Sequence, residues 1–313
     1  MLVIVLMINS TDNDIVRRQQ EFNNQYGIYA LDVPQQISFA GKSIDLRQEE
    51  IRERFDRELL VNTYWQSQTL LLLKRKERWF SMIEPILRQH QVPEDFKYLA
   101  MAESGFTNTV SPSGATGFWQ FLDGTGIHYG LEITDDVDER YHVQKATIAA
   151  CKYLNESYSI FKDWNLVTAS YNMGIDGVRK QMEKQKADNY FDLLLSEETS
   201  RYLFRVMALK EICSDPLKYG FHLRARDFYA PYNYVVITVD SSITDLADFA
   251  KTHGVSYKEL KMLNPWLRSN TLSNPGHKKY EIFIFNNNHA QADNYEHDTT
   301  WIRTLPRKEF HQE

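Results

Sequence analysis

Residues 92–105 read VPEDFKYLAMAESG and carry the signals of a short helix with a glutamate in its last turn. Gly105 suits the C-terminal cap of such a helix. Glu103 follows Phe96 by seven residues and Leu99 by four, so these side chains share one face of the helix. Burial and the helix dipole would both raise the pKa of the Glu103 carboxyl, as a general acid near neutral pH requires. From spacing alone, an exposed or ion-paired glutamate at a helix end is the alternative.

The segments that follow this helix favour a catalytic role. A loop at 111–117 reads SPSGATG and leads into FWQF at 118–121, and two later segments read SYNMG at 170–174 and EETSRY at 197–202. In these motifs the chain resembles the lytic transglycosylases of the soluble and membrane-bound D type. Their pattern contains a Glu-Ser pair, a Ser-x-x-Gly-Ala-x-Gly loop and a Gly-Leu-Trp-Gln-Phe stretch. The match extends in order over residues 46–220, which is more specific than any single motif.

The resemblance implies a lysozyme-like helical domain with one catalytic carboxylate. Glu103 would be the single acid/base, and the reaction would use no cofactor and no metal. The side chains expected to line the saccharide groove are Ser111, Gln120, Tyr171, Asn172, Glu198 and Tyr202. Two departures from the family pattern are Phe118 for leucine and Ser170 for alanine. Glu198 also falls at a predicted helix start, where a contact with the helix dipole is an equally open interpretation.

The resemblance also implies a reaction, the cleavage of the β-1,4 bond between N-acetylmuramic acid and N-acetylglucosamine in peptidoglycan. With one catalytic carboxylate, the C6 hydroxyl of muramic acid would replace water as the nucleophile and close a 1,6-anhydro ring. The carboxylate pair of most glycoside hydrolases is then not needed. The alternatives are a hydrolytic muramidase on the same fold and a catalytically silent scaffold that binds the wall. The intact set of Glu103, Gln120, Tyr171 and Asn172 argues against the scaffold.

Most of the chain is predicted to be α-helical, with no strand before residue 230. Apolar residues recur at helical spacing from residue 46 onward, and Pro85 is expected to kink or restart a helix. Further helices are expected at 93–104, 144–161, 164–171 and 199–213. The expected domains are an N-terminal extension at 1–45, a catalytic domain at 46–230, a small module at 231–286 and a polar tail at 287–313.

The pattern of the small module is β-α-α-β. YVVITV at 234–239 and YEIFIF at 280–285 are strand-like, and two capping-box spacings between them, starting at Ser242 and Ser256, open short helices. This order resembles LysM, a peptidoglycan- and chitin-binding module. The Gly-Asp-Thr-Leu turn of that family reads VDSSI at 239–243 here. Glycan binding and a purely structural or docking role are therefore both open.

The net charge of -6 over 313 residues gives no support for a nucleic-acid partner. The expected partner is the glycan strand of peptidoglycan, bound by a monomer. The apolar run Met1–Ile8 is too short for a membrane span and is interpreted as an export signal, with a signal remnant or a strand as alternatives. The protein is accordingly expected in the cell envelope, exported to the periplasm or associated with the outer membrane.

The remaining candidates receive structural interpretations. Cys151 and Cys213 are expected to be small buried hydrophobic residues, with a single disulfide as the alternative. His128 and His142 are interpreted as ordinary loop residues, and residues 138–140 (DER) as a turn with ion pairs. Trp119 suits either the core or a platform for stacking a sugar.

Overall fold

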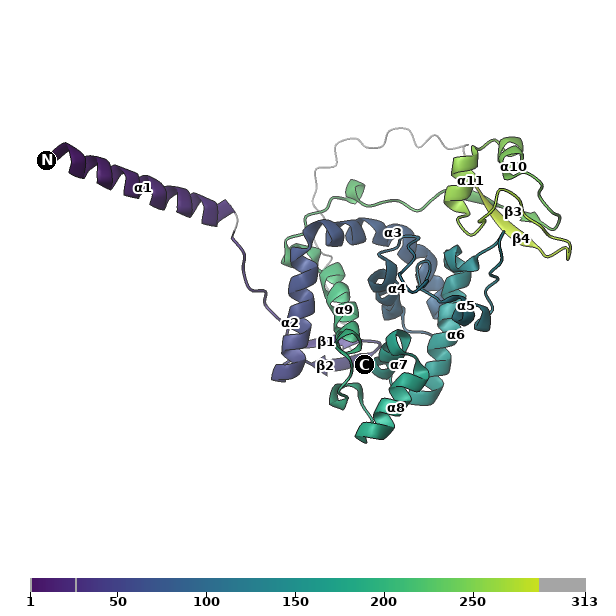
Figure 1. Cartoon of the computed structure of the whole chain (residues 1–313), viewed down its shortest axis with the longest axis horizontal. Helices are drawn as coiled ribbons and strands as arrows, with labels where there is room; N and C mark the ends of the chain where they lie inside the picture. The colour runs from purple at the N-terminus through teal and green to yellow at the C-terminus, as the bar shows by residue number, and fades with distance from the viewer. Residues whose placement is uncertain (1, 26, 287–313) are drawn as a thin grey trace, which may run out of the picture. The chain divides into compact units, whose positions relative to one another are not determined.

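The computed structural model describes residues 2–25 and 27–286 of the chain (Figure 1). It consists of two compact units, residues 1–32 and residues 33–313. The first unit contains one helix, α1 (Leu2–Gln25), so the strand alternative for the N-terminal apolar run is wrong. Among the described residues, none of the helices is both long and apolar enough to cross a membrane. The predicted polar tail at 287–313 lies outside the described residues.

The second unit is mainly α-helical and ends in a β-α-α-β module, which confirms the predicted fold class. Its α-helices are α2 (Glu49–Tyr64), α3 (Gln66–Gln89), α4 (Lys97–Ser104), α5 (Asp123–His128), α6 (Val143–Phe161), α7 (Trp164–Met173), α8 (Ile175–Gln185), α9 (Glu197–Ser214), α10 (Leu246–Thr252) and α11 (Tyr257–Leu263). Its 3-10 helices are η1 (Glu94–Phe96), η2 (Glu139–Tyr141), η3 (Tyr190–Asp192), η4 (Pro216–Tyr219) and η5 (Ala225–Asp227). Its strands pair antiparallel as β1 (Gln36–Phe39) with β2 (Lys42–Asp45) and β3 (Tyr234–Val239) with β4 (Tyr280–Phe285).

Helix α9 is the central helix of the helical domain. It lies between α2 and α7 and also contacts α4 (Figure 1). Its buried side chains include Tyr202, Leu203, Phe204 and Val206, which occupy successive directions around the helix axis. A helix that is apolar on most sides is one surrounded by other elements. This packing brings the side chain of Tyr202 from α9 against Glu103 near the C-terminal end of α4.

Helix α3 runs through Pro85 without a break, so the predicted restart there is wrong. A proline inside a helix removes one N–H donor and leaves the carbonyl four residues earlier, that of Ser81, without its helical partner. Both Ser81 and Pro85 are exposed. Water can therefore satisfy the Ser81 carbonyl, and the helix tolerates the proline.

The expectation of no strand before residue 230 is also wrong, because β1 and β2 form a hairpin. Each strand has only four residues, too few for alternation to stand out in the sequence. The hairpin turns at Ala40 and Gly41, both with positive φ, as a two-residue turn of this kind requires. Its Ile37 and Phe39 side chains are buried, and Lys210 of α9 donates to the Ser38 carbonyl at 2.6 Å.

Helices α2 and α9 are joined by a buried carboxylate. Glu58 is 1% exposed and accepts hydrogen bonds from Arg57 at 2.6 Å and from Arg201 at 2.7 Å. Arg205 lies 3.7 Å from its other oxygen. Glu197 also pairs with Arg201, at 3.4 Å, but its side chain is 80% exposed.

We expect Glu58→Ala to lower the free energy of unfolding by about 2 kcal/mol, because the arginines would lose a buried partner. Glu197→Ala is the matched control and should change it by less than about 0.5 kcal/mol, since exposed pairs contribute little. Urea unfolding followed by circular dichroism measures both. Equal effects of the two substitutions would contradict the structural role of Glu58.

The C-terminal module has the predicted β-α-α-β order. Ser256 caps α11 in a capping box with Glu259, as the spacing predicts. The corresponding expectation for Ser242 is wrong, because Asp245 caps α10 and the Ser242 hydroxyl instead accepts from the Asn274 amide at 2.8 Å. The Asp245 carboxylate accepts from two N–H groups of the first turn, which satisfies donors that the helix itself cannot satisfy.

The module packs directly on residues 132–142 of the helical domain. Val137 and Tyr141 are part of the module's hydrophobic core. The Asp138 amide donates to the carbonyl of Trp266 at 2.8 Å, and Val137 forms a β-bridge with Leu267. The two parts of the second unit are therefore joined by a shared core and by backbone hydrogen bonds.

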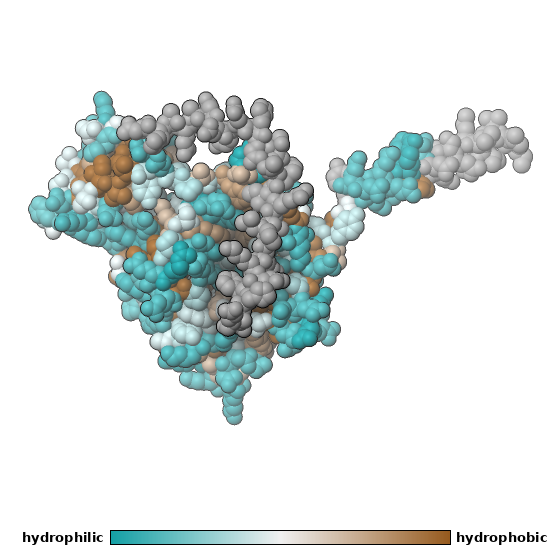
Figure 2. All heavy atoms as spheres, turned by 180° about the vertical axis from the view of Figure 1, so that it is seen from behind, coloured by the Kyte–Doolittle hydropathy of each residue, from teal (hydrophilic) through white to brown (hydrophobic). Residues whose placement is uncertain are grey.

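The turn at residues 138–140 contains the ion pairs predicted for it. Arg140 donates to the Asp138 carboxylate at 2.9 Å, and Glu139 pairs with Lys145. Cys151 and Cys213 are free and buried, as expected of small hydrophobic residues. Figure 2 shows that the face of the second unit seen from behind is mostly hydrophilic, with a hydrophobic patch over the module.

Candidate active site

A cleft of about 610 Å³ lies on the helical domain and contains the Glu103 carboxylate. The cleft brings together side chains that are far apart in sequence, from α4, from the 111–121 loop and from α7 and α9. Of the residues predicted to line a saccharide groove, it contains Ser111, Gln120, Tyr171, Asn172 and Glu198. Tyr202 is not part of its wall but contacts Glu103 directly.

Burial of Glu103 raises the pKa of its carboxyl to about 7, and this is the largest influence on the group. The hydrogen bond from Tyr202 and the positive charge of Arg205 oppose the rise, and Glu198 adds to it. The direction agrees with the expectation from the apolar helix face. A carboxyl group with this pKa is partly protonated at neutral pH, so it can both give and accept a proton there.

Two tyrosines lie near this carboxyl, Tyr202 buried and Tyr171 half-buried at the cleft. The Tyr202 hydroxyl donates to Glu103 Oε1, and the Tyr171 hydroxyl donates to the Trp119 carbonyl at 2.8 Å. Burial raises the pKa of both tyrosines well above its usual value. Both therefore stay neutral and act as hydrogen-bond donors. Among the described residues no group donates a hydrogen bond to Glu103 Oε2, so this second carboxyl oxygen is available to a ligand in the cleft.

Asn172 and Glu198 are linked to each other on the other side of the cleft. The Asn172 amide donates to Glu198 Oε1 at 3.3 Å and accepts from the Thr199 hydroxyl at 2.7 Å. Glu198 is exposed in the first turn of α9, so its position fits both the groove and the helix-dipole interpretation. Thr199 was not among the predicted site residues, although it follows Glu198 directly in the motif.

The 111–121 loop forms another wall and is held by its own side chains. Ser111 Oγ accepts from the Ala115 amide at 3.0 Å, and the Gln120 amide donates to the Gly117 carbonyl at 2.8 Å. Gln120 has a φ of 48°, which is uncommon for a residue with a side chain. The loop is thus ordered by local hydrogen bonds that also position Gln120 at the cleft.

Three aromatic candidates lie outside the cleft wall. Trp119 is fully buried and its Nε1 donates to the Thr147 hydroxyl at 2.9 Å, so it belongs to the core and is not a stacking platform. The loop interpretation is wrong for His128, which lies in α5. His142 lies outside the helices as the N-cap of α6, and its side chain is buried. Among residues 2–25 and 27–286, no cluster of His, Cys, Asp or Glu has the arrangement of a metal site.

Arg205 is a residue that the motifs did not indicate. It follows Tyr202 by three positions, hence it lies on the same face of α9, and its charge lowers the pKa of Glu103. The helical spacing from Tyr202 is the only sequence signal for it. Tyr153, Phe121 and Met173 also line the cleft and were not predicted.

Two family descriptions match the chain. Residues 81–193 match the transglycosylase SLT domain, and residues 236–288 match the C-terminal LysM-like domain of soluble lytic transglycosylases. The chain therefore carries a transglycosylase SLT domain followed by a LysM-like domain. The first match contains Glu103, Ser111, Gln120, Tyr171 and Asn172 but ends before Glu198 and Tyr202.

Among individual proteins, the chain is similar to membrane-bound lytic murein transglycosylase D of Escherichia coli strain K12. The two are 29% identical over 234 residues, which are 73% of this chain and 50% of the relative. The protein of the same name from Escherichia coli O6:H1 matches to the same extent. The chain thus spans about half the length of the curated relatives it matches.

Two solved structures show a weaker likeness. The 70 kDa soluble lytic transglycosylase of Escherichia coli superposes with a TM-score of 0.40 at 18% identity, over 58% of this chain and 32% of that chain. An inactive mutant of lytic transglycosylase Slt from Pseudomonas aeruginosa superposes with a TM-score of 0.36 at 18% identity, over 48% and 26%.

Proposed function

We propose that this protein is a peptidoglycan lytic transglycosylase with Glu103 as its single acid/base. The substrate would be the β-1,4 bond between N-acetylmuramic acid and N-acetylglucosamine, and the product a 1,6-anhydromuramoyl end. The observation that carries the proposal is the Glu103 carboxyl, partly buried in a cleft with a pKa of about 7. The SLT domain match and the lytic murein transglycosylase relatives support the substrate class.

The first step is general acid catalysis. Protonated Glu103 donates its proton to the glycosidic oxygen while the bond from C1 of muramic acid to that oxygen breaks. The N-acetylglucosamine residue leaves with a new hydroxyl group. Tyr202 holds the other carboxyl oxygen, which limits the rotation of the acid. General acid catalysis by a positioned group contributes roughly 100- to 10,000-fold.

In the second step the same carboxylate acts as a base. It takes the proton from the C6 hydroxyl of muramic acid, and O6 bonds to C1. No water is consumed, and Glu103 returns to its protonated form. Because the nucleophile belongs to the sugar itself, orientation within the cleft supplies much of the rate enhancement. Gln120 and Asn172 carry amides that can pair with hydroxyl and N-acetyl groups of the glycan.

Mass spectrometry of the products tests the proposal. Purified peptidoglycan is digested, and the released muropeptides are examined for 1,6-anhydro ends, which are one water lighter than hydrolysed ends. Anhydro ends are the expected result. Reducing N-acetylmuramic acid ends would replace the proposal with a hydrolytic muramidase. A protein that sediments with the wall and releases nothing would be a binding scaffold.

A second carboxylate in the cleft, Glu198, gives the hydrolytic alternative a specific residue. A hydrolase needs a second carboxylate as nucleophile or to activate water. We expect Glu198→Gln to keep anhydro products and to lower kcat/KM less than tenfold, because it still pairs with Asn172. The product masses and rates of Glu198→Gln, compared with those of the parent, distinguish a mechanism with one catalytic carboxylate from a mechanism with two. A loss as large as that of Glu103→Gln would favour two-carboxylate chemistry.

The hydrogen bond from Tyr202 predicts a pH effect. Activity needs protonated Glu103 and should fall as the pH rises above about 7. The Tyr202 hydrogen bond lowers the pKa of Glu103, so Tyr202→Phe is expected to move this fall to higher pH. Tyr190→Phe is the control, because the Tyr190 hydroxyl donates to the Ser200 carbonyl at 2.8 Å and not to Glu103. A midpoint that stays in place or falls in Tyr202→Phe would contradict the assignment.

The location and organisation are proposed on the same basis. Peptidoglycan lies in the cell envelope, and the relatives are named as membrane-bound murein transglycosylases. We propose an exported, periplasmic or outer-membrane-associated monomer whose partner is the glycan strand. We also propose that the catalytic domain comprises residues 46–230 and the module residues 231–286.

A further inference from the structure

Arg140 contacts the loop that forms one wall of the catalytic cleft. Its side chain is buried and does not line the cleft itself. The guanidinium donates to the carbonyl of Gly114 and to that of Phe121, both at 3.3 Å. Gly114 lies in the SPSGATG part of the loop, and Phe121 follows Gln120 directly. One buried side chain therefore holds two separate parts of the cleft wall.

The rest of Arg140 strengthens this contact. A Cβ on Gly117 would lie 2.1 Å from the Arg140 carbonyl oxygen, so the backbone of Arg140 lies directly against the loop. The guanidinium also pairs with the Asp123 carboxylate in the first turn of α5, the helix that follows the loop. A guanidinium is planar and carries five donors in fixed directions, so it can hold several acceptors at once.

Asp138 connects Arg140 to the C-terminal module. Its carboxylate accepts from Arg140 Nε at 2.9 Å and from Nη2 at 2.6 Å, a paired geometry that fixes the orientation of both groups. The Asp138 amide donates to the Trp266 carbonyl of the module at 2.8 Å, and the neighbouring Val137 forms a β-bridge with Leu267. Asp138 thus contacts the module through its backbone and Arg140 through its side chain.

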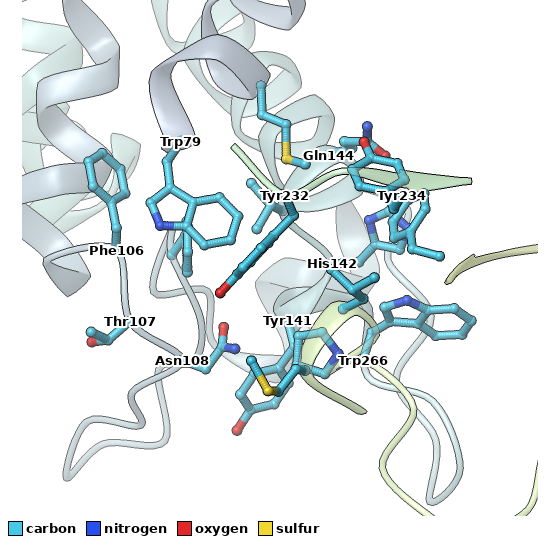
Figure 3. A pocket seen from close by; sticks show the side chains of 17 residues that line it. Trp79, Phe106, Thr107, Asn108, Tyr141, His142, Gln144, Tyr232, Tyr234 and Trp266 are labelled. Carbon is cyan, nitrogen blue, oxygen red and sulfur yellow. The ribbon is translucent and has the colours of Figure 1, made fainter. Parts of the chain in front are cut away.

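The residues that follow this turn meet the module as well. Tyr141 and His142 line a pocket of about 280 Å³ between the helical domain and the module (Figure 3). The ring of His142 lies 5.7 Å from that of Trp266. Phe118 of the 111–121 loop lines the same pocket. The loop, the turn and the module therefore meet in one region of the protein.

We propose that Arg140 is a positioning residue, through which the docked module holds the 111–121 wall of the cleft in its active shape. Gln120 has a φ of 48°, a conformation that persists only where the surrounding structure imposes it. Without the Arg140 contacts, Gln120 would leave this conformation, and a bound glycan would be less well oriented over Glu103. The effect on the reaction rate rests on the proposed function, whereas the effect on the loop does not.

The test compares Arg140→Lys with Arg224→Lys in the intact chain. Arg224 is the matched control, because its Nε and Nη2 also donate to one aspartate, Asp227, at 3.0 Å each, and neither residue lines the cleft. Lysine keeps the charge but lacks the planar fork that holds a carboxylate and two carbonyls together. Hydrogen–deuterium exchange reports on the loop, because the amides of Ser111 and Gln120 donate to carbonyls within it.

We expect Arg140→Lys to speed the exchange of the 111–121 amides by roughly tenfold, since fewer contacts oppose local opening. Its kcat on purified peptidoglycan should fall by roughly tenfold, because small displacements of positioning groups lower the rate strongly. Its KM should stay within about threefold of the parent, because the rest of the groove still binds the glycan. Arg224→Lys should resemble the parent in all three measurements.

A double variant, Val137→Ala with Lys278→Ala, tests the part played by the module. Val137 belongs to the module's hydrophobic core, and Lys278 of the module pairs with Glu139 at 3.4 Å. Neither residue lines the cleft. Because both substitutions weaken docking, we expect the 111–121 amides to exchange faster, whether or not the strands of the module stay protected.

Unchanged exchange of the loop in Arg140→Lys would overturn the proposal, and so would faster exchange with the kcat of the parent. Unchanged exchange in the double variant would show that the module plays no part. If Arg140→Lys does not fold, Asp138→Asn replaces it, since it keeps the shape and weakens the pair, and the same changes are expected. A parent that releases no anhydro ends while the loop responds as expected would refute the proposed function and leave the contacts of Arg140 established.

Discussion

Glu103→Gln is expected to lower the release of anhydromuropeptides by roughly 100- to 10,000-fold, the range of a lost general acid. Glutamine keeps the shape of the side chain and can still accept the hydrogen bond from Tyr202. It cannot donate a proton to the leaving oxygen or remove one from the C6 hydroxyl. Since both steps use this one group, no other residue in the proposed mechanism replaces it.

Glu94→Gln is the matched control for this substitution. Glu94 lies in η1, directly before α4, and pairs with Arg88 at 2.8 Å on the surface. Its loss should leave the rate within about twofold of the parent, because an exposed pair contributes little even to stability. Rates come from the mass-spectrometric assay on purified peptidoglycan. Retention of more than a tenth of the parent activity in Glu103→Gln would refute the assignment of the acid.

The same substitution has a stability consequence with a definite sign. The pKa of Glu103 is about 7 in the folded protein against 4.5 for the free group, so the folded state binds its proton more tightly. The stabilisation from this proton is complete below pH 4.5 and is lost as the pH rises to about 7. Glu103→Gln has no such proton to lose. As the pH rises from 4.5 to about 7, the parent should therefore lose stability that Glu103→Gln does not lose. The difference in the free energy of unfolding, variant minus parent, should increase over this range, as urea unfolding can measure.

Gly117→Ala is expected to lower the free energy of unfolding by about 4 kcal/mol, the second large effect. Gly117 has a φ of 77°, and a Cβ there would lie 2.1 Å from the Arg140 carbonyl oxygen. The backbone conformation alone costs an alanine roughly 1–2 kcal/mol. The rest comes from moving one backbone segment away from the other, because neither can yield as a flexible side chain does.

Gly114→Ala separates these two causes. Gly114 lies in the same loop with a φ of 83°, and a Cβ there would meet nothing within 4 Å. Its replacement should therefore cost only the conformational part, roughly 1–2 kcal/mol. Thermal and urea unfolding measure both variants. Equal destabilisation would show that contact with Arg140 is unimportant. We also expect Gly117→Ala to lower activity, because the displaced loop carries Ser111 and Gln120.

The motifs of the chain identified most of the predicted residues that line the cleft, but not how these residues are arranged in space. The helix with Glu103 in its last turn, the 111–121 loop and the SYNM segment of α7 were each recognisable, because local patterns report helix faces, caps and turns. The hydrogen bond between Tyr202 and Glu103 joins residues 99 positions apart. Only the packing of α9 against α4 creates this hydrogen bond. The same packing brings Arg205 of α9 close enough to lower the pKa of Glu103.

The errors in the sequence analysis have a common physical origin. The β1–β2 hairpin is too short to show a period, and its Ile37 and Phe39 are held by contacts with the helical domain rather than by propensity. Pro85 is tolerated because its helix is exposed at that point. Trp119, for which the sequence left the core and a stacking platform open, is buried by elements distant in sequence. In each case contacts with residues distant in sequence decided the local structure or the burial of the side chain, and a local sequence pattern does not report such contacts.

The sequence by itself determined the mainly helical fold class, the order of the two domains and the position of Glu103 on an apolar helix face. These depend on periodicity, capping residues and motif spacing, which act over a few neighbouring residues. The tertiary structure alone decided the rise in the pKa of Glu103 to about 7 and the joining of the module to residues 132–142. It also decided the pocket that the two parts enclose. These features depend on which surfaces exclude water, and that is set by contacts between residues far apart in the chain.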